Sequence, residues 1–89
     1  MNAFLPIYPD FVVELRPQSD RIEDLQAKME KYVANGAQLG WLIDPLAQIV
    51  YVYRPGEPMQ HLNRPDEITG GPILPGFAMD LDRIWELDL

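Results

Sequence analysis

The chain has 89 residues, carries a formal net charge of −7 and contains no cysteine. A chain of this length forms one small domain at most, and it buries only about 60–65% of the surface that its unfolded form exposes. The lack of cysteine excludes a disulfide scaffold, a thiolate zinc site and a cysteine nucleophile. The acidic charge argues against strong DNA binding, because phosphate neutralisation supplies most of that affinity.

The sequence indicates neither a signal peptide nor a membrane span. Residues 1–8 contain no basic segment followed by a long apolar run. No apolar stretch approaches the roughly 20 residues that a membrane-spanning helix needs. Together with the lack of cysteine, these features predict a cytoplasmic protein.

The first predicted element is a strand over residues 11–15, with the sequence FVVEL. It is apolar except for Glu14, as in strands that are covered on both faces, and Pro17 ends the run. A carboxylate in such a strand is costly unless it is paired, bound to a metal or close to solvent. Glu14 is therefore either a residue at the strand edge that reaches water or a metal ligand in a cleft.

A helix is predicted next, over residues 20–35. Asp20 is the expected N-cap, and Glu23 stands three residues later, as in a capping box. Asn35 and Gly36 form a typical stop signal. Apolar side chains recur at helical spacing between these ends, at Ile22, Leu25, Met29, Tyr32 and Val33.

Lys28 lies at the border of the apolar face of this helix, roughly 90° from its centre when each residue turns about 100°. In that position the side chain either covers the edge of the core or extends its ammonium group inward past the end of the first strand. We expect the ammonium group to point toward Glu14. Lys31 lies nearly opposite the apolar face and is expected in solvent.

The second half of the chain reads as strands and turns. Strands are expected over residues 39–44, 49–53 and 59–62, a loop over 66–75, a short strand over 77–81 and a closing helical turn over 81–87. A strand–helix–strand unit needs a parallel pair, and the short connection at Pro45 predicts an antiparallel hairpin. The sheet is therefore mixed, with the first two strands central. A single long helix leaves half of the sheet surface uncovered, which predicts self-association into a homo-oligomer.

Several segments, in order along the chain, resemble the Uma-type putative restriction endonuclease family of the PD-(D/E)XK nuclease superfamily. They are residues 9–15 (PDFVVEL), 19–21 (SDR), 28–32 (KMEKY), Gly36, 41–45 (WLIDP) and 74–77 (LPGF), followed by Leu81 and Ile84. The resemblance covers nearly the whole chain after Pro9. It implies an α/β fold with a restriction-endonuclease-like mixed sheet, here a β-α-β-β-(β) fragment lacking the N-terminal helix and strands.

The chemistry that this resemblance implies is Mg²⁺-dependent DNA cleavage, in which carboxylates hold the metal and a lysine orients water or stabilises charge. Glu14 matches the motif's glutamate and is the implied catalytic residue and metal ligand. Arg16 stands where the superfamily signature has lysine. Lys28 matches the lysine that this family carries on the following helix and is the implied catalytic base or charge stabiliser. The family strand with the first metal-binding aspartate has no counterpart here. Asp10 does not replace it, because it lies about 13 Å from Glu14 along an extended strand.

These observations leave two functions open for residues 1–89, which we expect to form the C-terminal half of a nuclease domain. One is a partial Mg²⁺-dependent DNA endonuclease that is weakly active or inactive alone. The other is a catalytically dead domain that self-associates and binds protein partners. The remaining polar and aromatic candidates favour structural roles: His61 in solvent, Asp44 in a turn, and Trp41 and Trp85 in the core or an interface.

Overall fold

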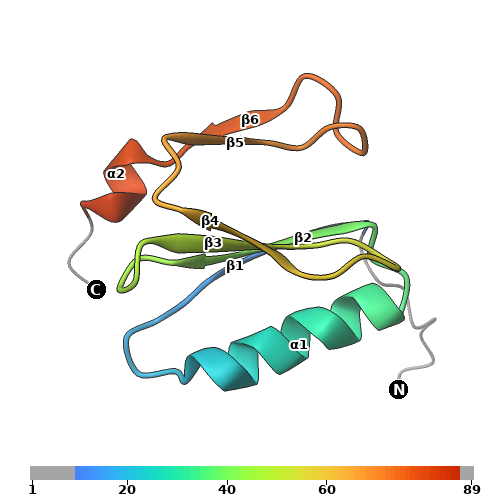
Figure 1. The fold of residues 1–89 in the computed structure, drawn as a ribbon, viewed down its shortest axis with the longest axis horizontal. Coiled ribbons are helices and arrows are strands. Elements are labelled where there is room, and N and C mark those ends of the chain that lie inside the picture. The colour runs from blue at the N-terminus through green and yellow to red at the C-terminus, as the bar shows by residue number, and fades with distance from the viewer. Residues whose placement is uncertain (1–9, 87–89) are drawn as a thin grey trace, which may run out of the picture.

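The structure is a computed structural model, and it describes residues 10–86. A long helix, a four-stranded sheet and a two-stranded hairpin with a short helix lie in successive layers (Figure 1). The elements are β1 (Phe11–Leu15), α1 (Ile22–Ala34), β2 (Leu39–Asp44), β3 (Ile49–Tyr53), β4 (Gln60–Asn63), β5 (Glu67–Thr69), β6 (Ala78–Asp80) and α2 (Asp82–Trp85). Neither helix is long and apolar enough to cross a membrane.

The main sheet has the strand order β1-β2-β3-β4. β1 and β2 are parallel and are connected through α1, whereas β2, β3 and β4 follow one another as antiparallel neighbours. The predicted mixed sheet is therefore present, but the prediction that the first strand is central is wrong. Among residues 10–86, β1 lies at the edge of the sheet, because both hairpin connections after β2 extend the sheet on the opposite side.

β2 is buried over its whole length. Alternation along a strand sends neighbouring side chains to opposite faces. Leu42 accordingly packs in the core under α1, together with Val12 and Met29. Trp41 and Ile43 pack in a second core on the other face.

The second face of the sheet is covered by the β5–β6 hairpin and α2 (Figure 1). Ile68, Leu81 and Trp85 contribute buried side chains from these elements, and the Trp85 indole Nε1 donates a hydrogen bond to the Pro65 carbonyl at 2.8 Å. The expectation of a half-uncovered sheet and of a loop over residues 66–75 is thus wrong in part. The core role of Trp85 was predicted, whereas Ile68 stands alone in a polar segment, so no periodic pattern marks it as a core residue.

The start of α1 also differs from the prediction. The helix begins at Ile22 with Arg21 as its N-cap, and no side chain caps it. Asp20 instead belongs to the preceding turn, where its N–H donates to the Pro17 carbonyl at 3.1 Å and its carbonyl accepts from Arg16 Nε at 3.0 Å. The backbone groups of Asp20 are thus engaged in this turn, and its side chain does not cap the helix as the capping-box pattern predicted.

Gly40 lets α1 lie close to β2. A Cβ atom at this position would stand 2.7 Å from Met29 Cε, and Met29 is completely buried. We expect Gly40→Ala to lower the free energy of unfolding by about 1 kcal/mol, because the buried Met29 side chain must move its terminal methyl group to make room. Denaturant unfolding measures this loss. The loss should shrink in a Met29→Ala background, and a fully additive double-mutant cycle would contradict the close contact.

Candidate active site at the edge of the sheet

Glu14 lies in β1 on the face of the sheet that α1 covers. Val12, two residues earlier, lies on the same face, and the residue paired with Glu14 in β2 is Leu42. Lys28 of α1 extends toward it, and Lys28 Nζ lies 2.7 Å from Glu14 Oε1. The expected direction of the Lys28 side chain is therefore confirmed. The side chains are 22% exposed for Glu14 and 49% for Lys28, so the pair is open to solvent.

The ion pair keeps Lys28 protonated. The hydrogen bond from the ammonium group to Glu14, followed by the charge of that carboxylate, raises the pKa of Lys28 above its ordinary value. The Tyr32 ring also lies beside the ammonium group, with its centroid 5.9 Å from Nζ. At neutral pH the pair consequently presents a fixed cation beside a carboxylate.

A second ion pair lies two residues further along the same face. Arg16 Nη1 donates to Asp44 Oδ2 at 2.8 Å, and Asp44 is buried. The other oxygen, Asp44 Oδ1, accepts the backbone N–H groups of Leu46 at 3.0 Å and Ala47 at 3.2 Å. The turn-forming role predicted for Asp44 is confirmed, whereas its ion pair was not predicted.

Arg16 connects three parts of the site. Its guanidinium group joins the end of β1 to the end of β2 through Asp44, and its Nε donates to the Asp20 carbonyl in the turn before α1. The turn that Arg16 holds leads directly into the helix that carries Lys28. No sequence pattern indicates this link, because Arg16 and Asp44 meet only through the parallel pairing of β1 with β2.

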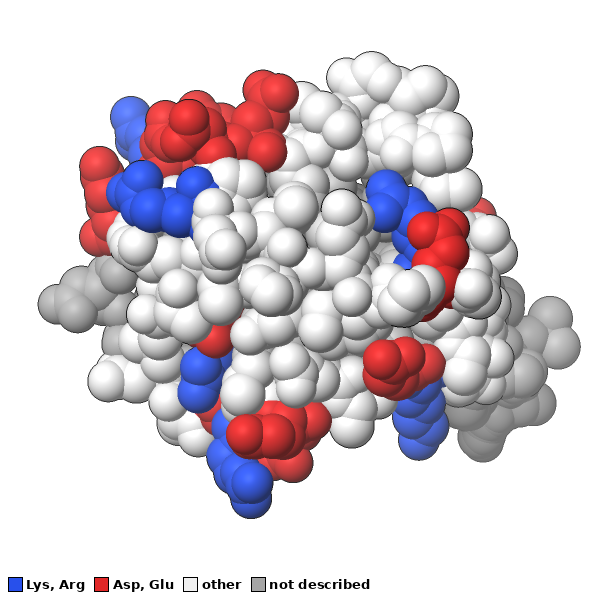
Figure 2. Space-filling view, in the orientation of Figure 1, with Lys and Arg blue, Asp and Glu red and all other residues white. Residues whose placement is uncertain are grey.

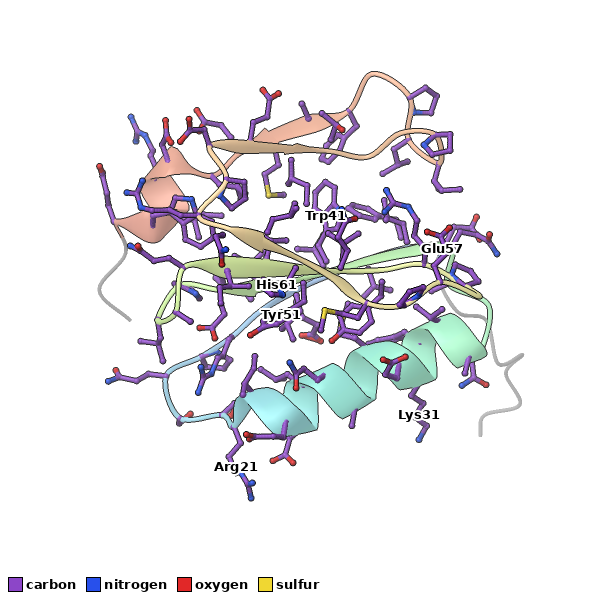
Figure 3. All side chains as sticks on the ribbon, in the orientation of Figure 1. Arg21, Lys31, Trp41, Tyr51, Glu57 and His61 are labelled. Atoms are coloured by element: carbon purple, nitrogen blue, oxygen red, sulfur yellow. The ribbon has the colours of Figure 1, made fainter. Side chains whose placement is uncertain are left out.

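Two other polar candidates lie outside the pair. His61 is exposed on β4 and is paired with Tyr51 of β3, with ring centroids 6.3 Å apart (Figure 3). Asp10 is exposed just before β1, where its carbonyl accepts the N–H groups of Gln38 and Leu39. Within residues 10–86, no three histidine or acidic side chains come together as a metal site.

Charged side chains lie in small groups around the rim of the visible surface, whose centre is uncharged (Figure 2). In the space-filling view, lysine and arginine residues lie scattered among acidic residues and form no continuous basic stripe on the face shown (Figure 2). Lys31 points away from the sheet on the outer side of α1 (Figure 3), as expected. Of the two lysines of α1, Lys28 is the one that the fold brings to Glu14.

The buried ion pair generates a stability prediction. Asp44→Ala leaves the Arg16 guanidinium group without its partner and frees two backbone N–H groups, so we expect a loss of about 3 kcal/mol or more in the free energy of unfolding. Denaturant unfolding measures the loss. Glu23→Ala, which removes a carboxylate from an exposed pair on α1, is the matched control and should change stability by less than about 1 kcal/mol. Equal effects of the two variants would contradict the structural role of Asp44.

The Glu14–Lys28 pair generates a prediction for alkaline pH. Because the folded-state pKa of Lys28 is raised, its contribution to stability is complete below the ordinary lysine pKa of 10.5 and is lost as pH rises through the folded-state value. Stability should thus fall more steeply above pH 10.5 in the native chain than in Lys28→Met. Burial raises the pKa of Tyr53 to about 12. The stability of both proteins therefore also falls at alkaline pH, because the unfolded chain loses the Tyr53 proton at a lower pH than the folded chain. Identical alkaline profiles would show that the pair contributes nothing.

Comparison with known proteins identifies the family of this chain. No curated protein matches it. A crystal structure of a putative nuclease belonging to DUF820, from Anabaena variabilis ATCC 29413, superposes with a TM-score of 0.76 and 25% sequence identity. The match covers 90% of this chain and 45% of the nuclease chain, and it confirms the expected α/β nuclease-like fold. Residues 1–82 match the family Uma2, described as "Putative restriction endonuclease", and the chain belongs to that family.

Proposed function

We propose that this chain carries the glutamate–lysine part of a Mg²⁺-dependent DNA endonuclease site, and that one copy alone has little or no nuclease activity. The observation that carries the proposal is the 2.7 Å contact between Lys28 Nζ and Glu14 Oε1. It joins two residues from separate elements at an accessible place on a nuclease-like fold. Family membership supports DNA as the substrate.

The carboxylates of residues 10–86 do not form a complete Mg²⁺ site. Mg²⁺ binds near-octahedrally through one or two carboxylates, several waters and substrate phosphate oxygens. Glu14 is one suitable ligand, but its Oε1 already accepts a hydrogen bond from Lys28. Among residues 10–86, no further acidic side chains gather with it as a metal site. This shortage of ligands supports weak or absent activity for a single copy.

The two side chains have distinct roles in this proposal. Lys28, held as a cation by Glu14, stabilises negative charge on a phosphate oxygen and does not act as a base at neutral pH. Glu14 is the metal ligand. Arg16 does not replace Lys28, because its guanidinium group is engaged by Asp44 and by the Asp20 carbonyl, and a guanidinium group transfers protons poorly.

A plasmid-cleavage assay with Mg²⁺ or Mn²⁺ tests the proposal. Cleavage by the 89-residue chain should be at or near background. Any activity above background should be lost in Glu14→Gln and Lys28→Met, because both metal binding and charge stabilisation depend on the pair. Lys31→Met, on the solvent side of the same helix, is the matched control and should change nothing. Metal-dependent cleavage that Glu14→Gln leaves intact would refute the assignment.

A catalytically inactive domain that self-associates is the second candidate. The exposed apolar side chains Val13 and Leu15 on the edge strand favour it. The two candidates differ in metal binding. Calorimetry should detect Mg²⁺ binding that Glu14→Gln abolishes if the endonuclease assignment is correct, whereas an inactive domain should show no difference between the native chain and that variant.

A further inference from the structure

A cavity lies between the main sheet and β5, on the face of the sheet opposite α1. Trp41 of β2, Val52 of β3 and Leu62 of β4 line it from the sheet, and Ile68 of β5 lines it from the second layer. Figure 3 shows Trp41 between these two layers. The volume of the cavity is about 230 Å³, which is below the roughly 300–1,000 Å³ of pockets for drug-sized ligands. The cavity therefore suits a small molecule.

The walls of the cavity are largely apolar. Trp41, Val52 and Ile68 are buried members of the second core, and Leu62 packs against them. Contact with such walls favours apolar ligand surface, because that surface leaves water on binding. A strongly hydrated group would instead lose its water there without compensation. Most of the surface of a ligand that fits this cavity is therefore apolar.

Trp41 also brings a hydrogen-bond donor to the cavity. The residue is completely buried, and its indole Nε1 has no hydrogen-bond partner among residues 10–86. The second tryptophan differs, since Trp85 Nε1 donates to the Pro65 carbonyl at 2.8 Å. A buried donor without an acceptor costs stability. Bulk water does not reach Trp41, so the missing acceptor has to come from the cavity itself.

Arg54 places a cation at the same cavity. It follows β3 and stands two residues after Val52, so alternation directs both side chains to one face. Arg54 is half-buried, and in the described part of the chain it forms no ion pair. A guanidinium group donates two parallel hydrogen bonds to a carboxylate. The group that complements both donors is therefore a carboxylate.

We propose that this cavity binds a small organic carboxylate with an apolar body. The carboxylate accepts hydrogen bonds from Arg54 and from the Trp41 indole N–H, and the apolar body lies against Leu62 and Ile68. Glu67 also lines the cavity, and the chain carries a net charge of −7. Both favour a single negative charge over the roughly −2 of a phosphate monoester. The site is independent of the proposed nuclease function, because the Glu14–Lys28 pair lies on the other face of the sheet.

A nuclear magnetic resonance titration with benzoate and hexanoate tests the site. Loss of one indole N–H signal in Trp41→Phe assigns the Trp41 resonance. In the native chain this resonance should move downfield and saturate as either carboxylate is added, because its proton gains an acceptor, whereas the Trp85 resonance should stay in place. Benzamide, which has the same shape without the charge, should bind at least about tenfold more weakly. If the Trp41 resonance does not move, its N–H is satisfied within the protein, for example by the Phe11 ring, and the proposal is overturned.

Arg54→Met tests the anchor of the carboxylate in the same titration. Its dissociation constant for benzoate should rise at least about tenfold, because the charge-assisted hydrogen bonds are lost. Arg83→Met is the matched control, since Arg83 is exposed on α2 and does not line the cavity, and it should bind like the native chain. If Arg54→Met does not fold, Arg54→Lys decides, and it should bind more weakly than the native chain because it lacks the paired donors. Equal dissociation constants for native and Arg54 variants, or tighter binding of phenyl phosphate than of benzoate, would overturn the assignment.

Discussion

The burial of β2 on both faces is the constraint on which the rest of the structure depends. A strand whose six residues are all buried needs a complete layer on each side, and in this small protein the two layers are of different kinds. α1 covers one face, and the β5–β6 hairpin with α2 covers the other. Gly40 allows the close approach of α1. Trp41 provides the aromatic centre of the opposite core, where the Phe11 and Phe77 rings lie 4.8 Å and 6.0 Å from it.

Two ion pairs on one face of the sheet differ in environment and therefore in role. Arg16–Asp44 is largely shielded from water, and its atoms also bind backbone groups in two turns. Such a pair costs stability when one partner is removed. Glu14–Lys28 is accessible to solvent, so its contribution to stability is small. A pair that contributes little to stability and lies at an accessible sheet edge is free to serve binding or catalysis, which is why we assign the candidate site to it.

β1 brings two different surfaces to one short strand. It places Glu14 on the face that α1 covers, beside Lys28. Val13 and Leu15 leave apolar side chains exposed on the opposite face. The strand holds a polar site and an apolar surface at once, because alternation along a strand sends neighbouring side chains to opposite faces.

The local sequence determined the elements that carry the site. Apolar runs bounded by turn residues predicted β1, β2 and β3, helical periodicity predicted α1, and the border position of Lys28 predicted its approach to Glu14. These features depend on neighbouring residues alone. Only the tertiary structure decided that β1 lies at the edge, that Arg16 bonds to Asp44 and that β5, β6 and α2 cover the second face. Each of these depends on residues far apart in the sequence, such as Ile68 and Trp85, which become neighbours only when the strands have paired and the layers have packed.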